Sequence, residues 1–496
     1  MRKHAFLAAL LALLMLLPTL AACGDKTPGN TPVNTPDTTA TPTVSDTTAP
    51  VETEPAETEY PAPQIEAVDY TGKELRILVN EPRAEFNYDE AVYTENSGDV
   101  INDAIFKRNT QIMDKYGLKI LSTGASTGAG LKTFTNAINA GTNDFHFGSI
   151  RICDIMSLAA SGMMSNIADL NYIDIEAPWY YQTLQDALSI GGEDYLLTGY
   201  YNMHIFDSAP GLYNNKDMAD KHQIASMEDM VFDGTWTLDK FFEICSQVGN
   251  DINQDGIIDE TDEVGLTAHP GGILNFVVGA DADFVRKNSD DIPVYIGVDE
   301  KNEGTLSKIL TNLYTAPASL HKEYAKFTSF TGGFNEGRSL FLLNCLYEMP
   351  NLAANGTKFG VLPMPKANEA QENYRIHTHS KLGTAIGVPN NNTELEMTTA
   401  VLEDMMYLSY KYIYPAHIEK TMQYRYAADS NATEILKIMF NSLCIEMSTA
   451  LNLTCDSELR KLGNVHSTDI ASTYAASAEK NKKTIETYVA SFTNKQ

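Results

Sequence analysis

The sequence predicts an α/β protein that is built from two lobes. Between residues 74 and 149, strand-like apolar runs alternate with stretches of helical periodicity in the order β-α-β-α-β. This order is typical of an open parallel sheet with helices on both faces. About 430 residues follow a polar N-terminal stretch. One hydrophobic core rarely serves a chain of that length, so two lobes are expected.

The elements of this sheet are expected in a simple order. A strand over 74–79, Glu-Leu-Arg-Ile-Leu-Val, comes first. Asp99 caps a helix whose apolar residues recur at helical spacing as far as Tyr116, and Gly117 ends it. The remaining elements are a strand over 118–121, a helix over 131–140 and a strand over 144–149.

Three charged side chains stand where two of these strands end. Glu81 follows the first strand, and Arg151 and Asp154 follow the third. Ligands of open parallel sheets bind beyond the carboxyl ends of the strands. These three residues are therefore candidate ligand-binding residues.

Residues 1–22 predict a secretory signal peptide. Arg2 and Lys3 precede an apolar run over 5–20 that is too short for a membrane span, and small residues precede Cys23. The closing Leu-Ala-Ala-Cys resembles the bacterial lipobox. That resemblance implies that Cys23 carries lipid, palmitate included, and anchors the chain to the extracytoplasmic face of the cell membrane. An ordinary secretory signal with a cysteine at its cleavage site is the alternative.

Residues 23–66 are expected to form a disordered linker. Thr, Pro, Asp and Glu dominate it, and large apolar side chains are almost absent. Such a segment cannot bury enough apolar surface to offset its chain entropy. At up to ~3.1 Å per residue it would reach on the order of 100 Å, which holds a folded body clear of a membrane surface.

The chain has an ordinary globular composition but a strong negative charge. Hydrophobic residues make up 43% and charged residues 20%, and the net charge is −29. This charge disfavours nucleic acid and polyanionic ligands, so neutral or cationic small molecules are the expected partners. The five cysteines after Cys23 show no C-x-x-C spacing, which argues against a disulfide framework and against a zinc site. Buried free thiols are expected, with a Cys444–Cys455 bridge as the alternative.

The stretch 251–262, Asp-Ile-Asn-Gln-Asp-Gly-Ile-Ile-Asp-Glu-Thr-Asp, predicts a structural calcium loop. Such a loop needs ligands at positions 1, 3, 5, 7, 9 and 12 and a glycine at position 6. The residues at the ligand positions are Asp251, Asn253, Asp255, Ile257, Asp259 and Asp262. Position 12 departs from the usual bidentate Glu, and it resembles the Asp-ended loops of dockerin-like sites. An acidic turn without metal is the alternative.

Four further motifs carry a family resemblance. They are Pro178-Trp-Tyr-Tyr181, Leu212-Tyr-Asn-Asn-Lys-Asp217, Gly234-Thr-Trp-Thr-Leu-Asp239 and Phe359-Gly-Val-Leu-Pro-Met-Pro365. In this order and behind a lipobox, they resemble the bacterial extracellular solute-binding proteins of ABC importers, in the family 1 group typified by maltose-binding protein. The resemblance implies a periplasmic-binding-protein-like fold, with two α/β lobes around a ligand cleft and a hinge that the chain crosses more than once.

The same resemblance implies where the lobes lie. Lobe 1 is expected at 67–200 and 345–385, and lobe 2 at 201–344 and 386–496. Crossings between the lobes are then expected near 198–202, 338–344 and 384–389.

The resemblance also implies a carbohydrate ligand, for which three more residues are candidates. Sugar rings lie against aromatic side chains, and their hydroxyls need a few fixed polar groups. Trp179 follows Pro178 in a loop and is a candidate platform, with packing inside the first lobe as an equal alternative. Tyr347 lies where the family has a strand leading to a cleft aromatic, and Glu348 beside it is a candidate hydroxyl acceptor.

These observations predict a lipid-anchored binding protein that delivers a small solute, by expectation an oligosaccharide, to ABC permease subunits and performs no covalent chemistry. A surface-anchored hydrolase acting on glycans is one alternative, and a peptide-capturing or adhesion lipoprotein on the same fold is another. Gly124-Ala-Ser-Thr-Gly128 matches a nucleophile elbow. An elbow also needs an oxyanion-hole loop and a later Asp and His in defined contexts, and this polar loop favours a non-catalytic role.

Overall fold

A computed structural model of the chain describes residues 60–493 apart from short gaps. The gaps are 82–88, 94, 96, 127, 257, 260, 316–320, 324–330 and 424–430. The predicted signal peptide, Cys23 and the linker up to residue 59 lie outside the described residues. Within the described part, no helix combines the length and the apolar character that a membrane crossing needs.

The first sheet confirms the predicted parallel arrangement. Its strands are β1 (Glu74–Asn80), β2 (Lys119–Ala125), β3 (Phe147–Arg151) and β12 (Thr384–Gly387). They lie in the order β12-β3-β1-β2. β1 is parallel to both β2 and β3, whereas β12 is antiparallel to β3. Three strands that are close in sequence, β1, β2 and β3, therefore run in one direction, and a distant segment closes the edge.

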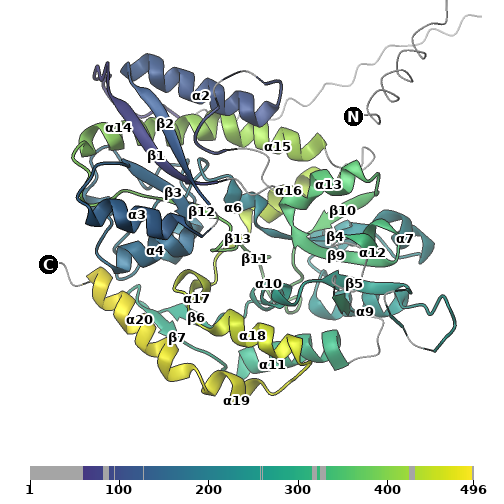
Figure 1. The fold of residues 1–496 in the computed structure, drawn as a ribbon. Helices are drawn as coiled ribbons and strands as arrows, with labels where there is room; N and C mark the ends of the chain where they lie inside the picture. Colours follow the sequence, from purple (N-terminus) through teal and green to yellow (C-terminus); the bar gives the residue numbers. More distant parts are fainter. Residues whose placement is uncertain are drawn as a thin grey trace, which may run out of the picture. The chain divides into compact units, whose positions relative to one another are not determined.

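Helices cover both faces of this sheet, as Figure 1 shows. They are α2 (Val100–Tyr116), α3 (Gly130–Asn139), α4 (Ile152–Ala160) and α14 (Leu395–Leu408). The alternation along β1 places Ile77 in a core with α2 and α14, and Leu78 in a second core with α3 and α4. As predicted, Asp99 caps α2 by accepting from two backbone N–H groups, and Gly117 ends it at φ 69°.

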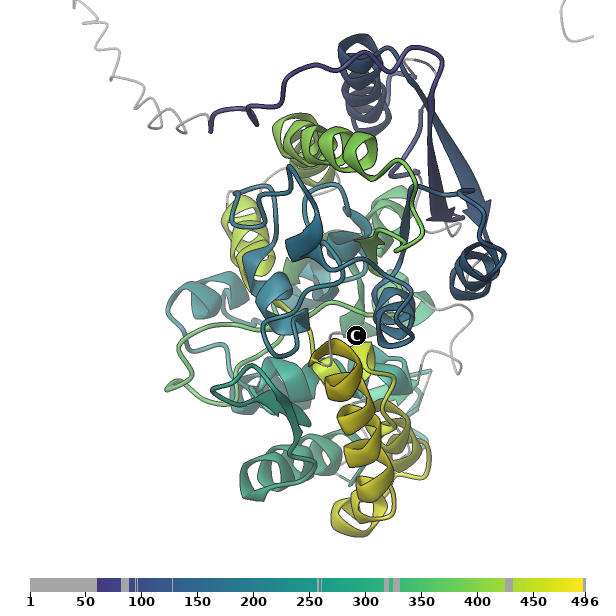
Figure 2. The same cartoon turned by 90° about the vertical axis from the view of Figure 1, so that its left-hand side faces the viewer.

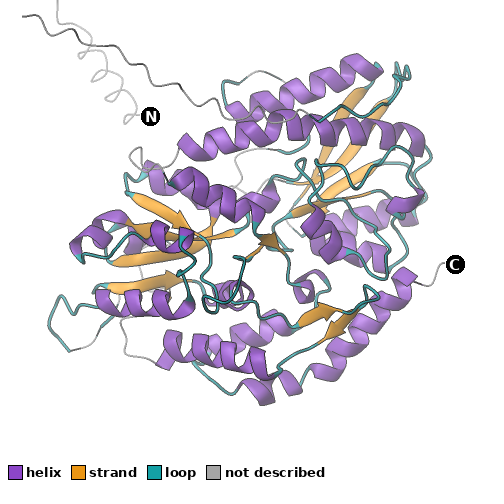
Figure 3. Ribbon diagram, turned by 180° about the vertical axis from the view of Figure 1, so that it is seen from behind, coloured by secondary structure: helices purple, strands orange, loops and turns teal. Residues whose placement is uncertain are grey.

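The second sheet has five strands. They are β4 (Pro210–Asn215), β5 (Val264–Ala268), β8 (His321–Glu323), β9 (Ser339–Cys345) and β10 (Phe359–Leu362). The order is β10-β4-β9-β5-β8, in which β5 is parallel to β8 and β9, and β4 is antiparallel to β9 and β10. Figure 3 shows the two sheets in separate halves of the described body, each surrounded by helices.

The remaining elements complete the second lobe. Its helices are α7 (Lys216–Lys221), α8 (Met227–Phe232), α9 (Leu238–Val248), α10 (Ile273–Gly279), α11 (Glu300–Leu310), α12 (Gly332–Asn335), α13 (Met349–Ala354), α16 (Ala432–Asn441), α17 (Met447–Ala450), α18 (Cys455–Asn464), α19 (Ile470–Ala475) and α20 (Ala478–Thr493). Two short pairs are β6 (Val285–Lys287) with β7 (Pro293–Tyr295), and β11 (Ile376–His377) with β13 (Leu443–Cys444). Figure 2 shows α19 and α20, in yellow, at the end of the body away from α2.

The chain passes between the two sheets three times. The first crossing, residues 198–209, runs from a residue paired with β12 to β4 and contains α6 (His204–Asp207). The second, residues 363–383, runs from β10 to β12. The third starts where α14 ends and continues through the π-helical turn η6 (Ser409–Ile413) and α15 (Tyr414–Gln423).

The expected division of the lobes differs from the observed one. β9 and β10 both lie in the second sheet, so 345–362 belongs to lobe 2, and of the expected 345–385 only the start of β12, residues 384 and 385, lies in lobe 1. No crossing occurs near 338–344. β12 and α14 belong to the first lobe, although 386–496 was expected in the second. An apolar run identifies a strand but not its sheet, because both sheets contain strands that are buried on both faces, such as β4, β5 and β10 in the second and β12 in the first. Of the expected crossings, the one near 198–202 coincides with an observed crossing, and the one near 384–389 adjoins the observed crossing 363–383.

All five cysteines of the described residues carry free thiols. This confirms the expected thiols and leaves no bridge between Cys444 and Cys455. Burial raises the pKa of the Cys245 thiol well above its usual value, so this side chain acts as a small core residue.

A buried carboxylate joins α14 to the aromatic residues near 180. Glu403 is 1% exposed and accepts hydrogen bonds from Trp179 Nε1 at 3.1 Å and from the Tyr180 hydroxyl. Burial raises the pKa of Glu403 to about 7, and the hydrogen bonds oppose that rise. Glu403 therefore keeps its proton in the folded chain at a pH where it has lost it in the unfolded chain.

Replacing Glu403 with Gln is expected to flatten the pH dependence of stability. Because the folded-state pKa lies above the unfolded one, the folded chain binds more protons between about pH 4.5 and 7, and stability falls as pH rises through this window. Urea unfolding of E403Q should lose less stability from pH 5 to pH 7.5 than the wild type does. Glu243→Gln, at an exposed position, is the control. If the unfolding free energy changes with pH equally in the wild type and in E403Q, Glu403 is not the source of the pH dependence.

The close packing of β5 on α9 is tested by two glycine substitutions. A Cβ on Gly265 would lie 2.5–2.9 Å from Cβ, Cα and O of Cys245, so G265A should cost about 1–3 kcal/mol of unfolding free energy. Gly304 lies within α11 with open space around it, so G304A should add about 1 kcal/mol. Urea denaturation measures both, and a neutral G265A would mean that the strand and helix separate easily.

Candidate functional site

The carboxyl ends of β1, β2 and β3 meet at one edge of the first sheet, because these strands are parallel. Glu81 directly follows β1, and its N–H donates to the carbonyl of Ala125 at the end of β2 at 2.7 Å. Its side chain lies over Gly124, where a Cβ would come within 2.7 Å of Glu81 Cγ. The Glu81 residue is exposed, so this candidate lies at the solvent-facing edge where strand-end reasoning placed it.

Arg151 and Asp154 form an ion pair at the same edge. Nε and Nη2 of Arg151 donate to the two carboxylate oxygens of Asp154, both at 2.7 Å, and this pairing raises the pKa of Arg151. The guanidinium also reaches the loop after β2, where a Cβ on Gly128 would lie 3.4 Å from Nη1. The structure therefore places Glu81 over the end of β2 and the guanidinium of Arg151, held by Asp154, at the loop that follows it.

The last residue of β1, which strand-end reasoning also points to, adds a further polar group. Asn80 Oδ1 is a buried atom with no hydrogen-bond partner among the described residues. It faces the start of α3, where a Cβ on Gly130 would lie 3.2 Å away. α3 has no side-chain cap. An amide oxygen beside the start of a helix suits hydroxyl groups, which both donate and accept.

The N-terminus of α4 lies at this edge but is already occupied. The N–H groups of Ile152 and Cys153 donate to the carbonyl oxygens of Gly383 (3.1 Å) and Ser380 (3.2 Å) in the second crossing. These bonds satisfy two of the amides that a helix start leaves open. α4 therefore holds the crossing in place and offers fewer donors to a ligand than α3.

At the second sheet, Tyr347 and Glu348 follow β9 in the turn Leu346–Glu348. Tyr347 is half-buried, whereas Glu348 is 8% exposed and accepts a hydrogen bond from Asn344 Nδ2 at 3.1 Å. Both residues lie at the carboxyl end of a strand that is parallel to β5. Of the two, Tyr347 has more surface left for a ligand.

Two polar side chains near the end of β5, His269 and Arg460, were not among the site residues predicted from the sequence. His269 directly follows β5, and its Nδ1 accepts from the N–H of Gly271 at 2.9 Å. A Cβ on Gly271 would collide with the guanidinium of Arg460, which is held by Asp456 through Nε at 2.9 Å. The strand-end rule could have found His269, because it follows an apolar run. Nothing local connects Arg460 to this edge, since it comes from α18.

Trp179 lies inside the first lobe. It is 4% exposed, and its ring meets Tyr407 edge to face at 5.3 Å between centroids. It lines a pocket of about 500 Å³ together with residues 60–65 and Glu403. This burial favours the packing role over the sugar platform, because no ring face is open to the strand-end edge.

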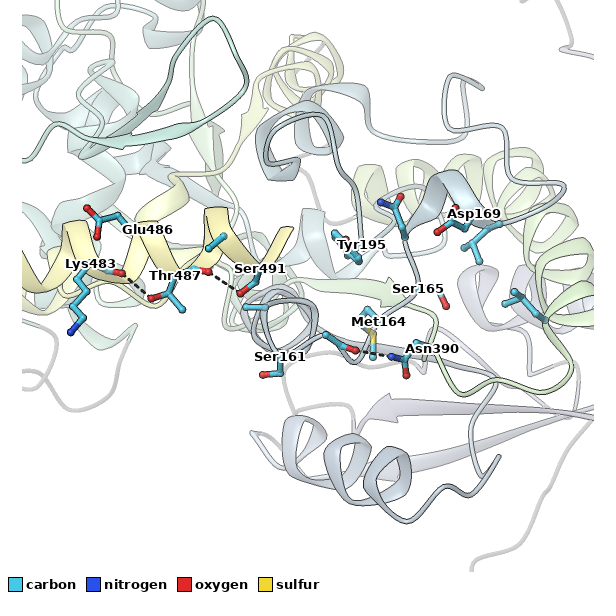
Figure 4. A pocket seen from close by; sticks show the side chains of 16 residues that line it. Ser161, Met164, Ser165, Asp169, Tyr195, Asn390, Lys483, Glu486, Thr487 and Ser491 are labelled. Carbon is cyan, nitrogen blue, oxygen red and sulfur yellow. Dashed lines mark hydrogen bonds between the residues drawn. The ribbon is translucent and has the colours of Figure 1, made fainter. Parts of the chain in front are cut away.

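A pocket of about 1120 Å³ lies at the opposite edge of the first sheet. Figure 4 shows its walls, with Thr487 and Ser491 of α20 on one side and Met164 and Asn390 on the other. α4 runs back from the carboxyl edge, and β12 is antiparallel to β3, so both lead to the amino ends of the parallel strands. None of the candidate residues lines this pocket.

The predicted calcium loop lies between α9 and β5. Asp251 accepts from the N–H of Gln254 (2.7 Å) and Gly256 (2.8 Å), and Gly256 has φ 85°. Asp262 is fully buried and accepts from the N–H groups of Ile252 and Asp259 at 2.8 and 3.0 Å.

The donor set suits calcium in kind, because carboxylates and an amide dominate it. In the described residues, however, no three His, Cys, Asp or Glu side chains converge closely enough to hold a metal ion. Ile257, whose carbonyl would be the ligand at position 7, lies outside the described residues. Calcium binding by this loop therefore stays a prediction.

Comparison with protein-family models finds no match, and no curated protein matches the sequence. Solved structures match in fold. An ABC substrate-binding protein of Listeria monocytogenes in complex with cycloalternan matches with a TM-score of 0.55 at 12% identity, over 84% of this chain and 99% of that one. A cyclo/maltodextrin-binding protein complexed with maltotetraose gives 0.55 at 11% identity, over 85% and 98%. A solute-binding protein of Agrobacterium radiobacter in complex with ribitol gives 0.52 at 12% identity, over 84% and 100%.

These matches concern the fold, because the identities are low. They extend over most of this chain and nearly all of each matched chain, so both lobes are included. The expected periplasmic-binding-protein-like architecture is confirmed. The chain has the two-lobed α/β fold of the ABC sugar solute-binding proteins.

Proposed function

We propose that the chain is a lipid-anchored solute-binding protein that captures a small carbohydrate for an ABC importer. The observation that carries this proposal is the likeness of fold to structures bound to cycloalternan, maltotetraose or ribitol. All three are neutral molecules with many hydroxyl groups. A net charge of −29 is compatible with a neutral ligand and unfavourable for an anionic one.

The chemistry of the strand-end edges supports a hydroxyl-rich ligand. Glu81 and Asn80 offer acceptors, and Arg151 offers donors that Asp154 holds in a fixed direction. From the second lobe, Tyr347 offers a ring for the apolar face of a sugar. A few fixed polar groups beside an aromatic ring are typical of small-molecule sites.

The proposed mechanism is closure of the lobes. A ligand between the two strand-end edges contacts both lobes only when these approach, so its binding free energy shifts the open–closed equilibrium. Permease subunits then recognise the closed form. Cys23 and the linker keep the body near the membrane, and the chain itself changes no covalent bond of the solute.

We also propose that the loop 251–262 binds Ca²⁺ in a structural role. Asp251, Asn253, Asp255, Asp259 and Asp262 would supply side-chain oxygens, and residue 257 a carbonyl. The left-handed Gly256 and the buried Asp262 support this use of the loop. A bound cation would relieve the repulsion among the carboxylates and brace the connection from α9 to β5.

The ligand class is tested with the chain from residue 24 onward, which retains the linker and lacks the lipid. Maltotriose, maltotetraose, ribitol and unrelated short peptides are titrated calorimetrically, and small-angle scattering follows each mixture. Binding of at least one sugar with a smaller radius of gyration is expected, because closure compacts the body. Compaction with peptides alone, or release of sugar products, would contradict the proposal.

The role of Tyr347 is tested in the same titrations. Tyr347→Ala should weaken sugar binding by about tenfold, because a ring contact contributes about 0.5–1.5 kcal/mol beyond its buried area. The exposed Tyr60, beside Tyr410 in the first lobe, provides the control Tyr60→Ala. Equal affinities for wild type and Y347A would place the ligand away from the end of β9.

Calcium is tested by thermal unfolding with added Ca²⁺ or with chelator. At free calcium of about 100 times Kd, the wild type should gain about 2.7 kcal/mol. Asp255→Asn should remove this gain while leaving the chelated protein as stable as the wild type, because Asp255 is exposed. Asp290→Asn, in the exposed β6–β7 turn, is the control. If neither Ca²⁺ nor the chelator changes the stability of the wild type, the loop is a turn that binds no metal.

A further inference from the structure

Glu90 is a buried carboxylate that contacts the first crossing and the residue of β12 at which the second crossing ends. It is 5% exposed and accepts from the N–H of His204 (2.7 Å), from Thr384 Oγ1 (2.7 Å) and from Ser149 Oγ (3.2 Å). His204 lies in the first crossing, and Thr384 is where the second crossing enters β12. Asn202 of the first crossing donates to both hydroxyls, at 3.1 and 3.2 Å. The carboxylate therefore ties both crossings to β3.

Arg108 of α2 extends this network to the third crossing. It is fully buried, and its Nη2 donates to the carbonyl oxygens of Glu90 (2.9 Å) and Ala91 (2.8 Å). Its Nη1 donates to Ser409 Oγ at 3.1 Å, the first residue of the turn η6. The guanidinium also stacks over the ring of Tyr201 in the first crossing, at 4.7 Å from the centroid. Glu90 and Arg108 together thus contact the first and third crossings and the residue at which the second crossing ends.

Stability alone does not explain this arrangement. Burial of a charge is costly, and apolar side chains of the same volume often serve as well or better. Burial accordingly raises the pKa of Glu90 and lowers that of Arg108. What a hydrogen-bonded pair adds is direction, because each bond is favourable only over a narrow range of angles.

Glu90 and the residues it contacts are also close in sequence to the edge where β1 and β3 end, which carries the candidate ligand-binding residues. Glu90 follows Glu81 by nine positions, and Glu81 stands at the carboxyl end of β1. Ser149 and Thr384 lie on β3 and β12, next to the strand end that carries Arg151. Few residues therefore separate the candidate ligand-binding residues from the crossings.

We infer that Glu90 and Arg108 are positioning residues for lobe closure, which hold the three crossings together as one pivot. The inference rests on the proposed function, because a pivot matters only if the lobes move. When the crossings are held together, the lobes can approach each other in few ways even before a ligand binds. Less of the binding free energy is then needed to order the lobes. Without the network the crossings move independently, and closure becomes less favourable.

The test uses Glu90→Gln, which keeps the size of the side chain but loses its charge. In hydrogen exchange followed by mass spectrometry, E90Q should lose protection at 198–209 and 376–383 together, because its carboxylate accepts from His204 and Thr384. Arg108 bonds the backbone carbonyl of Glu90, so its contact with Ser409 at the start of 409–423 is tested by the second variant. With a sugar that binds the wild type, its affinity should fall by about fivefold or more. Ser409→Ala is a milder second variant, since it removes only one bond of Arg108 within a helical turn, and smaller changes of the same kind are expected.

The matched control is Glu446→Gln. Glu446 is also a buried carboxylate, at 1% exposed, but it accepts from the N–H groups of Phe284 and Val285 and from Ser448, all in the second lobe. E446Q should lower the unfolding temperature but leave protection in the first and third crossings unchanged, and sugar affinity within about twofold.

The inference is overturned if E90Q loses protection only around residues 89–91, or if E446Q exposes the crossings equally. Failure of the proposed function is a separate result. In that case the wild type binds no sugar, and hydrogen exchange still decides whether Glu90 and Arg108 hold the crossings together.

Discussion

The two-lobed structure depends on the pairing of β12 with β3. This pairing is antiparallel, from Thr384 opposite Arg151 to Gly387 opposite Gly148, and it brings a segment back to a sheet that the chain left after residue 197. On its other side, Ile386 exchanges two backbone hydrogen bonds with Leu197, at 2.8 and 2.9 Å. One short strand thus holds the point where the chain leaves the first lobe and the point where it returns.

Because the chain returns to the first sheet at β12, the lobes are joined by three chain segments instead of one linker. A single linker would leave their relative position open, whereas three crossings restrict it to rotations that all three segments tolerate. The amides at the start of α4 bind the second crossing at Ser380 and Gly383, and the carboxylate of Glu90 accepts from the first crossing and from Thr384, where the second crossing enters β12. The N–H groups at the start of α4 and the carboxylate of Glu90 therefore hold the connecting segments against the first lobe.

The candidate site follows from the direction of the strands. Parallel strands place the residues that follow them at one edge, which is why Glu81, Arg151 and Asp154 could be named from sequence and are found at one edge of the first sheet. Asn80 and His269 follow strands too and were within reach of the same rule. Arg460 was not, because α18 meets the end of β5 only in the folded chain. Trp179 shows the limit of composition, since a loop-like sequence gave no sign that Glu403 would take its indole N–H.

The sequence by itself determined the parallel unit of the first lobe, the cap and the end of α2, the free thiols and the family resemblance. These depend on local periodicity, on turn chemistry or on motifs, which are present in the chain before it folds. Only the tertiary structure decided that β9 and β10 belong to the second sheet, that β12 and α14 return to the first, and that Glu90 and Arg108 lie where the crossings meet. The physical reason is that burial and strand pairing join residues hundreds of positions apart, and an apolar run carries no record of its partner.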